Sequence, residues 1–117
     1  MAYVDGFVLA IPKANLEAYK ALARTAAEVW MEHGALSYVE CLADDTPYGE
    51  LTSFPRAVLA TEDETVGFAW ITYESRARRD EIMARVMADP RLQGSMADAP
   101  FDGKRMIFGG FETFVEK

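Results

Sequence analysis

Hydrophobic and polar positions follow two different periods along the chain. Residues 3–11 are rich in β-forming side chains up to Pro12, which is typical of a strand. Beyond that proline, the apolar positions that recur at intervals of three and four are Leu16, Tyr19, Ala23, Ala26 and Trp30. This spacing predicts a long helix over residues 13–33, and Gly34 is a natural end for it.

The rest of the chain divides at clusters of turn residues. Ser75 is a favourable N-cap for a second helix, which Asp89 and Pro90 end because the residue before proline avoids helical geometry. Gly109 and Gly110 interrupt the last strand and indicate a bulge or a close backbone approach. The other predicted elements are strands at 36–43, 65–74 and 106–115, a short strand at 56–60 and a loop at 91–104.

This order of elements predicts the fold class. Strand, helix, strand, strand, helix, strand is the ferredoxin-like βαββαβ arrangement, an α+β protomer with a four-stranded antiparallel sheet and both helices on one face. The chain has 117 residues, so we expect residues 1–117 to form a single domain.

Alternation along the strands separates bulky side chains from small ones. The bulky set consists of Tyr3, Asp5, Phe7, Leu9 and Ile11, then Tyr38, Glu40 and Leu42, then Phe68, Trp70 and Thr72. We expect the small set to pack against the helices and the bulky set to form an open face. An apolar patch of that size usually marks an interface, and the same face of a second copy is its simplest cover. The sequence therefore predicts a homodimer that encloses a barrel, with Asp5, Glu40 and Thr72 near its interior.

Charge and composition exclude several classes of protein. Twelve basic and nineteen acidic residues give a net charge of −7, so we do not expect nucleic acid as a partner. The sequence has no apolar run long enough to cross a membrane. One cysteine, Cys41, rules out an intramolecular disulfide and suits a reducing compartment, so we expect a cytoplasmic protein.

Three residues are candidates for acid–base chemistry. His33 can act as a general base, although a position in the last turn of a helix also suits a structural histidine. Asp5 and Glu40 gain catalytic potential if they are desolvated on a covered face; otherwise they pair with Arg, Lys or Tyr of the partner chain. Cys41 is expected to be a buried, inert thiol. No cluster has metal-ligand spacing and no cofactor motif is present, so neither a metal nor a cofactor is expected.

Two further groups are candidates for ligand binding. Phe7, Tyr38, Phe68 and Trp70 can form the wall of an aromatic pocket on the sheet face, or they can be ordinary packing residues. A second group of cations, Arg56, Lys104 and Arg105, can clamp an anionic ligand, or they can be solvated loop residues.

The chain also resembles the YbaA-like bacterial proteins, a family of unknown function. The segments that carry this resemblance are 3–7, 30–36, 38–41, 52–58, Phe68 with Trp70, 86–91 and 100–106. The resemblance runs almost from end to end, and the last segment is distinctive. It implies a dimeric α+β barrel with a ferredoxin-like protomer, and it supplies no established activity.

Two hypotheses for function follow. The first is small-molecule binding or cofactor-independent catalysis at a pocket on the sheet face; the second is a non-catalytic structural or interaction module. Some relatives carry a label that ties them to signal-recognition-particle RNA, but a net charge of −7 opposes phosphate binding.

Overall fold

The computed structural model describes residues 1–93 and 99–117. Its strands are β1 (Tyr3–Pro12), β2 (Ser37–Leu42), β3 (Glu64–Tyr73) and β4 (Ile107–Glu112). Its helices are η1 (Lys13–Asn15), α1 (Leu16–Glu32), α2 (Phe54–Ala57), α3 (Arg76–Ala88) and η2 (Gly103–Arg105).

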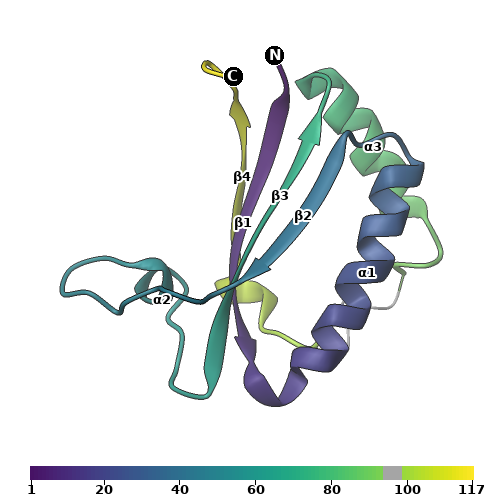
Figure 1. The fold of residues 1–117 in the computed structure, drawn as a ribbon. Coiled ribbons are helices and arrows are strands. Elements are labelled where there is room, and N and C mark those ends of the chain that lie inside the picture. The colour runs from purple at the N-terminus through teal and green to yellow at the C-terminus, as the bar shows by residue number, and fades with distance from the viewer. Residues whose placement is uncertain (94–98) are drawn as a thin grey trace.

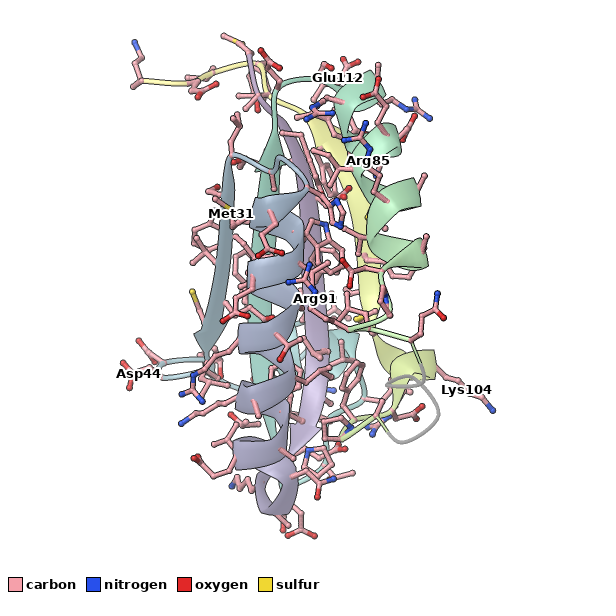
Figure 2. All side chains as sticks on the ribbon, turned by 90° about the vertical axis from the view of Figure 1, so that its right-hand side faces the viewer. Met31, Asp44, Arg85, Arg91, Lys104 and Glu112 are labelled. Carbon is pink, nitrogen blue, oxygen red and sulfur yellow. The ribbon has the colours of Figure 1, made fainter. Side chains whose placement is uncertain are left out.

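One four-stranded sheet has the order β2-β3-β1-β4, and every pair of neighbours is antiparallel. The two long helices, α1 and α3, cover the same face of this sheet (Figure 1). Figure 2 looks onto that side and shows both helices in front of the strands. The ferredoxin-like α+β class is confirmed.

Local sequence signals explain where the helices begin and end. The Ser75 hydroxyl accepts a hydrogen bond from the backbone N–H of Arg78 at 3.1 Å, which caps α3 as expected. Gly34 follows α1 with a φ of +114°, a conformation that costs glycine little and other residues much.

Two local predictions need correction. Residues 56–60 do not form a strand, because Ser53 caps a short helix, α2, with Pro55 in its first turn. The glycine pair in β4 forms no bulge, since Gly109 and Gly110 pair in continuous register with Gly6 and Asp5. The close backbone approach is confirmed: a Cβ on Gly110 would come within 2.8 Å of the Tyr3 ring. Within the predicted loop at 91–104, residues 94–98 lie outside the described residues.

The main core lies between the helices and the sheet. Val29 of α1 and Ile82 and Val86 of α3 have no exposed surface. On the sheet side they meet bulky residues, among them Tyr3, Ile71 and Tyr73. Leu9 and Ile11 extend this layer towards the start of α1.

The predicted assignment of faces is therefore correct for β3 and wrong for β1 and β2. Bulky side chains of β1 pack under the helices because β3 presents small residues beside them on the same face. Leu9 lies opposite Gly67, and Phe7 lies opposite Ala69. A close-packed layer needs large side chains beside small ones, so size alternates between neighbouring strands.

The other face of the sheet is covered only at one end. Residues 43–63, which we call the arm, leave β2 and pass on the side of the sheet away from the helices (Figure 1). Val58 of the arm is 1% exposed and packs with Ala10 and Val66. The remainder of this face, which we call the open face, carries no covering element among the described residues.

Candidate functional site

An apolar groove of about 570 Å³ runs along the open face. Its lining comes from three neighbouring strands and consists of Val4, Gly6, Phe7, Val8, Phe68, Trp70, Ile107, Phe108, Gly109 and Phe111. Gly6 and Gly109 pair across the strands, and because they lack side chains the Phe111 ring can lie close to both. The groove is thus lined by apolar side chains, several of them aromatic.

Aromatic rings of this groove remain partly exposed to solvent. The ring centroids of Phe68 and Trp70 lie 5.7 Å apart. The Phe54 ring of the arm meets Phe68 edge-on, with 5.8 Å between the ring centroids. Phe111 is 63% exposed and Phe68 is 40% exposed. Ligand sites are typically concave and mostly apolar, and exposed apolar patches of this kind mark interfaces.

The aromatic residues predicted from the sequence separate onto two faces. Phe68 and Trp70 lie on the open face, and Phe7 both lines the groove and packs against the helix-side core. Tyr38 is on the other face, where its ring tilts against Trp30 at 5.8 Å. A single aromatic wall that includes Tyr38 is therefore wrong, and ligand binding by the other three stays a prediction.

Glu40 lies on the helix side of the sheet, between two phenols. Its carboxylate accepts a hydrogen bond from the Tyr38 hydroxyl at 2.6 Å and a second, very short one from the Tyr19 hydroxyl. Burial and the adjacent carboxylate raise the pKa of both tyrosines well above the usual value, so both phenols stay protonated. Each oxygen of Glu40 is thus held by a fixed donor.

Asp5 is also on the helix side, and it is 5% exposed. It accepts hydrogen bonds from the Tyr73 hydroxyl at 3.0 Å and from the Arg79 guanidinium at 2.6 Å. Trp30 donates in turn to the Tyr73 oxygen at 3.1 Å. The prediction that Asp5 and Glu40 face a barrel interior is wrong. Their hydrogen-bond partners belong to the same chain, and the bonds tie the sheet to both helices.

His33 connects the ends of the two long helices. Its Nε2 lies 3.0 Å from an oxygen of Asp89, which also accepts from Arg91 at 2.8 Å. These hydrogen bonds hold the pKa of Asp89 well below its usual value. Arg91 reaches Glu32 of α1 at 2.5 Å, so the cluster joins the last turn of α1 to the end of α3. Its geometry is that of a structural contact, and catalysis by His33 stays a prediction.

Two of the three candidate loop cations already have partners. Arg56 donates to the carbonyl oxygens of Tyr48 and Gly49 and lies 3.9 Å from the centre of the Tyr48 ring. Arg105 donates to both oxygens of Glu64. Lys104 is exposed and points away from the protein (Figure 2). Anion binding by the three stays a prediction.

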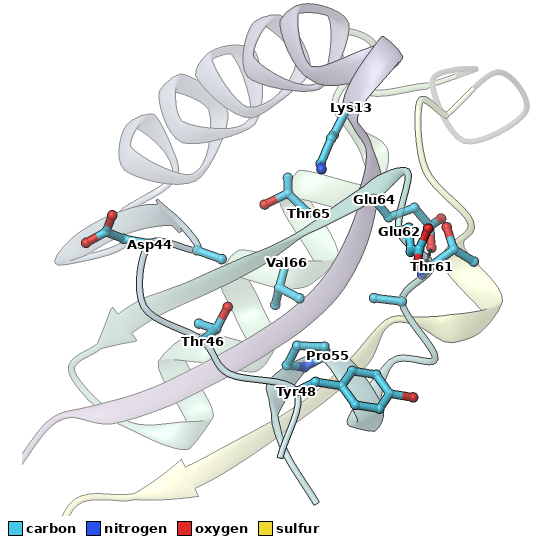
Figure 3. A pocket seen from close by; sticks show the side chains of 12 residues that line it. Lys13, Asp44, Thr46, Tyr48, Pro55, Thr61, Glu62, Glu64, Thr65 and Val66 are labelled. Carbon is cyan, nitrogen blue, oxygen red and sulfur yellow. Dashed lines mark hydrogen bonds between the residues drawn. The ribbon is translucent and has the colours of Figure 1, made fainter. Parts of the chain in front are cut away.

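A second hollow, of about 720 Å³, lies between the arm and the start of β3. Figure 3 shows the Lys13 ammonium pointing into it, with Val66 at the centre of its floor. The carboxylates of Asp44 and Glu62 lie on opposite sides of its rim. Sequence reasoning missed this pocket, because residues of distant segments meet there only after the arm has folded.

Cys41 is exposed, contrary to the prediction, because β2 is an edge strand. In residues 1–93 and 99–117, no group of three or more His, Cys, Asp or Glu side chains is arranged to hold a metal ion. No helix in the same part of the chain is long and apolar enough to cross a membrane.

Sequence reasoning also missed the partners of the two carboxylates. Tyr19 is one of the periodic apolar positions of α1, and this pattern does not show that its hydroxyl reaches Glu40. Arg79 lies near the start of α3, and nothing in the sequence around it indicates that it pairs with Asp5, 74 positions away. No signal in a single sequence reveals contacts of such range.

Comparison with known proteins identifies the family. The model of the family described as "Protein of unknown function (DUF1428)" matches residues 2–103. The chain is 48% identical over 117 residues to the uncharacterized protein YbaA of Escherichia coli strain K12, with all of both chains covered. This chain belongs to the DUF1428 family. The resemblance to YbaA-like proteins is thereby confirmed.

Solved structures with little sequence identity share the fold. A protein named as a candidate antibiotic biosynthesis monooxygenase from Nitrosomonas europaea aligns with a TM-score of 0.64 at 14% identity, over 96% of this chain and 89% of its own. A dimeric ferredoxin-like protein from an uncultured marine organism aligns with a TM-score of 0.56 at 12% identity, over 95% of this chain and 92% of its own. SnoaB, a cofactor-independent oxygenase from Streptomyces nogalater, aligns with a TM-score of 0.50 at 16% identity, over 98% of this chain and 93% of its own.

Proposed function

We propose that the protein binds a small, mostly apolar molecule in the open-face groove, and that a second copy of the chain closes the site. The observation that carries this proposal is the groove itself, which measures about 570 Å³ and is lined by apolar residues that include Phe68, Trp70 and Phe111. Its volume lies within the range of sites for small organic ligands.

The second copy is needed because the groove is open on its outer side. One side of a ligand bound there would stay exposed to water in the protomer. The same face of another copy, related by a two-fold axis, would bury that side of the ligand. One solved structure of this fold is described as dimeric, which supports this arrangement. Another is described as a cofactor-independent oxygenase, so the fold is compatible with chemistry that uses only the protein and its substrates.

Native mass spectrometry of freshly purified protein, repeated under denaturing conditions, tests both parts. We expect a dimer that carries extra mass, which denaturation releases as a small apolar compound. A dimer without extra mass that takes up no hydrophobic probe would instead support a structural or interaction module. A monomer would overturn the closed site.

A pair of variants tests the interface directly. Phe111→Glu places a charge at a ring that is 63% exposed in the protomer, so it should leave the fold intact and dissociate the dimer. Met87→Glu, on α3 and 61% exposed, is the matched control and should leave the dimer unchanged. If both variants remain dimeric, the interface lies elsewhere.

Tryptophan fluorescence tests the ligand part. Trp30 packs against the helix-side core and Trp70 lines the groove. In Trp30→Phe the remaining tryptophan reports on the groove, so a hydrophobic probe such as anilinonaphthalene sulfonate should quench it saturably. In Trp70→Phe the remaining tryptophan should not respond. Equal responses in the two variants would contradict binding in the groove.

A further inference from the structure

A separate hollow of about 260 Å³ lies on the helix side, where α1 passes the edge strand β2. Glu40 and Tyr19 contribute to its lining from the buried side, and Lys20 and Arg24 contribute from α1. It is independent of the open-face groove, because Glu40 is on the opposite face of the sheet from Trp70. Its volume is less than half that of the open-face groove, which suits a small ligand.

The buried side of this hollow offers a fixed hydrogen-bond acceptor. The hydroxyls of Tyr38 and Tyr19 each donate to one oxygen of the Glu40 carboxylate. An ionised carboxylate has about four lone-pair positions, and two phenols use only two of them. The tyrosines therefore orient the carboxylate and leave it able to accept from a ligand. Their raised pKa values keep them as donors to Glu40.

The solvent side of the hollow offers cations. Lys20 and Arg24 are four residues apart on α1, so they lie on the same face of the helix. Lys20 makes an exposed ion pair with Glu17, at 3.4 Å. The Arg24 guanidinium makes no hydrogen bond or ion pair with any residue that the structure describes. A free guanidinium at the mouth of a hollow is suited to a carboxylate, which it binds through two parallel hydrogen bonds.

These opposite charges define the ligand class. A simple anion would be attracted by Arg24 and repelled by Glu40. A simple amine would be attracted by Glu40 and repelled by Arg24. A molecule with a carboxylate and an ammonium a few bonds apart satisfies both groups. We propose that this hollow binds a small amino acid. The ligand carboxylate pairs with Arg24, and its ammonium donates to Glu40.

Nuclear magnetic resonance titration of the isotope-labelled full chain tests this assignment. Glycine, alanine and β-alanine are the probes, with propionate and propylamine as ligands that carry only one of the two charges. At least one amino acid should shift the backbone amides of residues 19–24 and 38–42 saturably below about 50 mM, and bind at least about tenfold more tightly than propionate or propylamine. No saturable shift with any of the three amino acids would overturn the proposal. Equal binding of propionate would overturn it as well.

Variants separate the two contacts. Arg24 is exposed, so Arg24→Ala should preserve the amide spectrum and weaken amino-acid binding about tenfold. Glu40→Gln should weaken it similarly by removing the charge that faces the ammonium. Arg85→Ala and Glu50→Gln change the same residue types at exposed positions and should have no effect. Unchanged binding in Arg24→Ala would contradict the assignment even if Glu40→Gln fails to fold.

Discussion

Replacing Glu64 with glutamine tests a partly buried ion pair that fastens the arm to the sheet. Arg105 donates to the two oxygens of Glu64 at 2.9 and 2.6 Å, and the backbone N–H of Thr61 donates to one of them at 2.9 Å. The Glu64 side chain is only 7% exposed. Arg105 also donates to the carbonyl oxygen of Leu59, so the pair joins the arm, β3 and η2.

The size of the effect follows from the pKa of Glu64. These hydrogen bonds lower that pKa from 4.5 to about 2. At 1.36 kcal/mol per unit the shift corresponds to roughly 3 kcal/mol, and solvent screening of the pair reduces the expected contribution to about 1–2 kcal/mol. Glu64→Gln should therefore lower the free energy of unfolding by about 1–2 kcal/mol at pH 7.

The lowered pKa of Glu64 also predicts how its contribution to stability changes with pH. A carboxylate whose pKa is lower in the folded state stabilises the fold fully above the unfolded pKa and loses this contribution as pH falls through the folded one. The difference between wild type and Glu64→Gln should thus be constant above about pH 5. It should shrink between pH 4.5 and about 2, the interval set by the two pKa values.

Urea unfolding at fixed protein concentration, followed by circular dichroism at pH 7, 5, 4 and 3, measures this difference. Glu62→Gln is the matched control, because Glu62 is an exposed glutamate two residues away. A loss in Glu64→Gln that does not change with pH would refute the assignment to the carboxylate charge. Equal stability of the variant and wild type at pH 7 would refute the ion pair as a stabilising contact.

Three further substitutions test the packing, all by urea unfolding. Gly67→Ala should lower the free energy of unfolding by about 1–3 kcal/mol, because the new Cβ would come within 2.9 Å of Ile11 Cδ1. Gly103→Ala is the control and should be tolerated, since a Cβ there would meet no atom within 4 Å. Ile82→Ala should cost about 2–5 kcal/mol, since the side chain is fully buried; a loss below 1 kcal/mol would contradict a close-packed core. Ser75→Ala should lower the free energy of unfolding by about 1 kcal/mol, because α3 loses its N-cap. Restored stability in Ser75→Asp would support loss of the cap as the cause.

Local patterns were sufficient to predict the order of elements. Alternation, helical spacing and the signals at Gly34 and Ser75 each act over a few residues, and the structure places the main elements where those signals lie. The error at residues 56–60 was also local. Ser53 followed by Pro55 is a helix-start signal, and it outweighs the apolar run after it, which by itself favours a strand.

The faces of β1 and β2 were not predictable by the same means. Alternation shows which residues share a face, but the choice of face depends on what the neighbouring strand presents beside them. In β3 the small residues Gly67 and Ala69 face the helices, and this allows Leu9 and Phe7 of β1 to occupy that side. An interpretation based on size within each strand misses this dependence, and it therefore misplaced Asp5 and Glu40 as well.

The corrected faces change what the sheet can do. The open-face groove is lined by apolar residues, whereas the carboxylates of Asp5 and Glu40 and their phenol partners lie on the helix side. A ligand in the groove is therefore held by shape and apolar contact, and a ligand at Glu40 is held by charge. Trp70→Phe should alter the first and spare the second, while Arg24→Ala should do the opposite. If one substitution abolished both kinds of binding, a single site or a change of fold would explain the result, and the separation of the two sites by the sheet would be wrong.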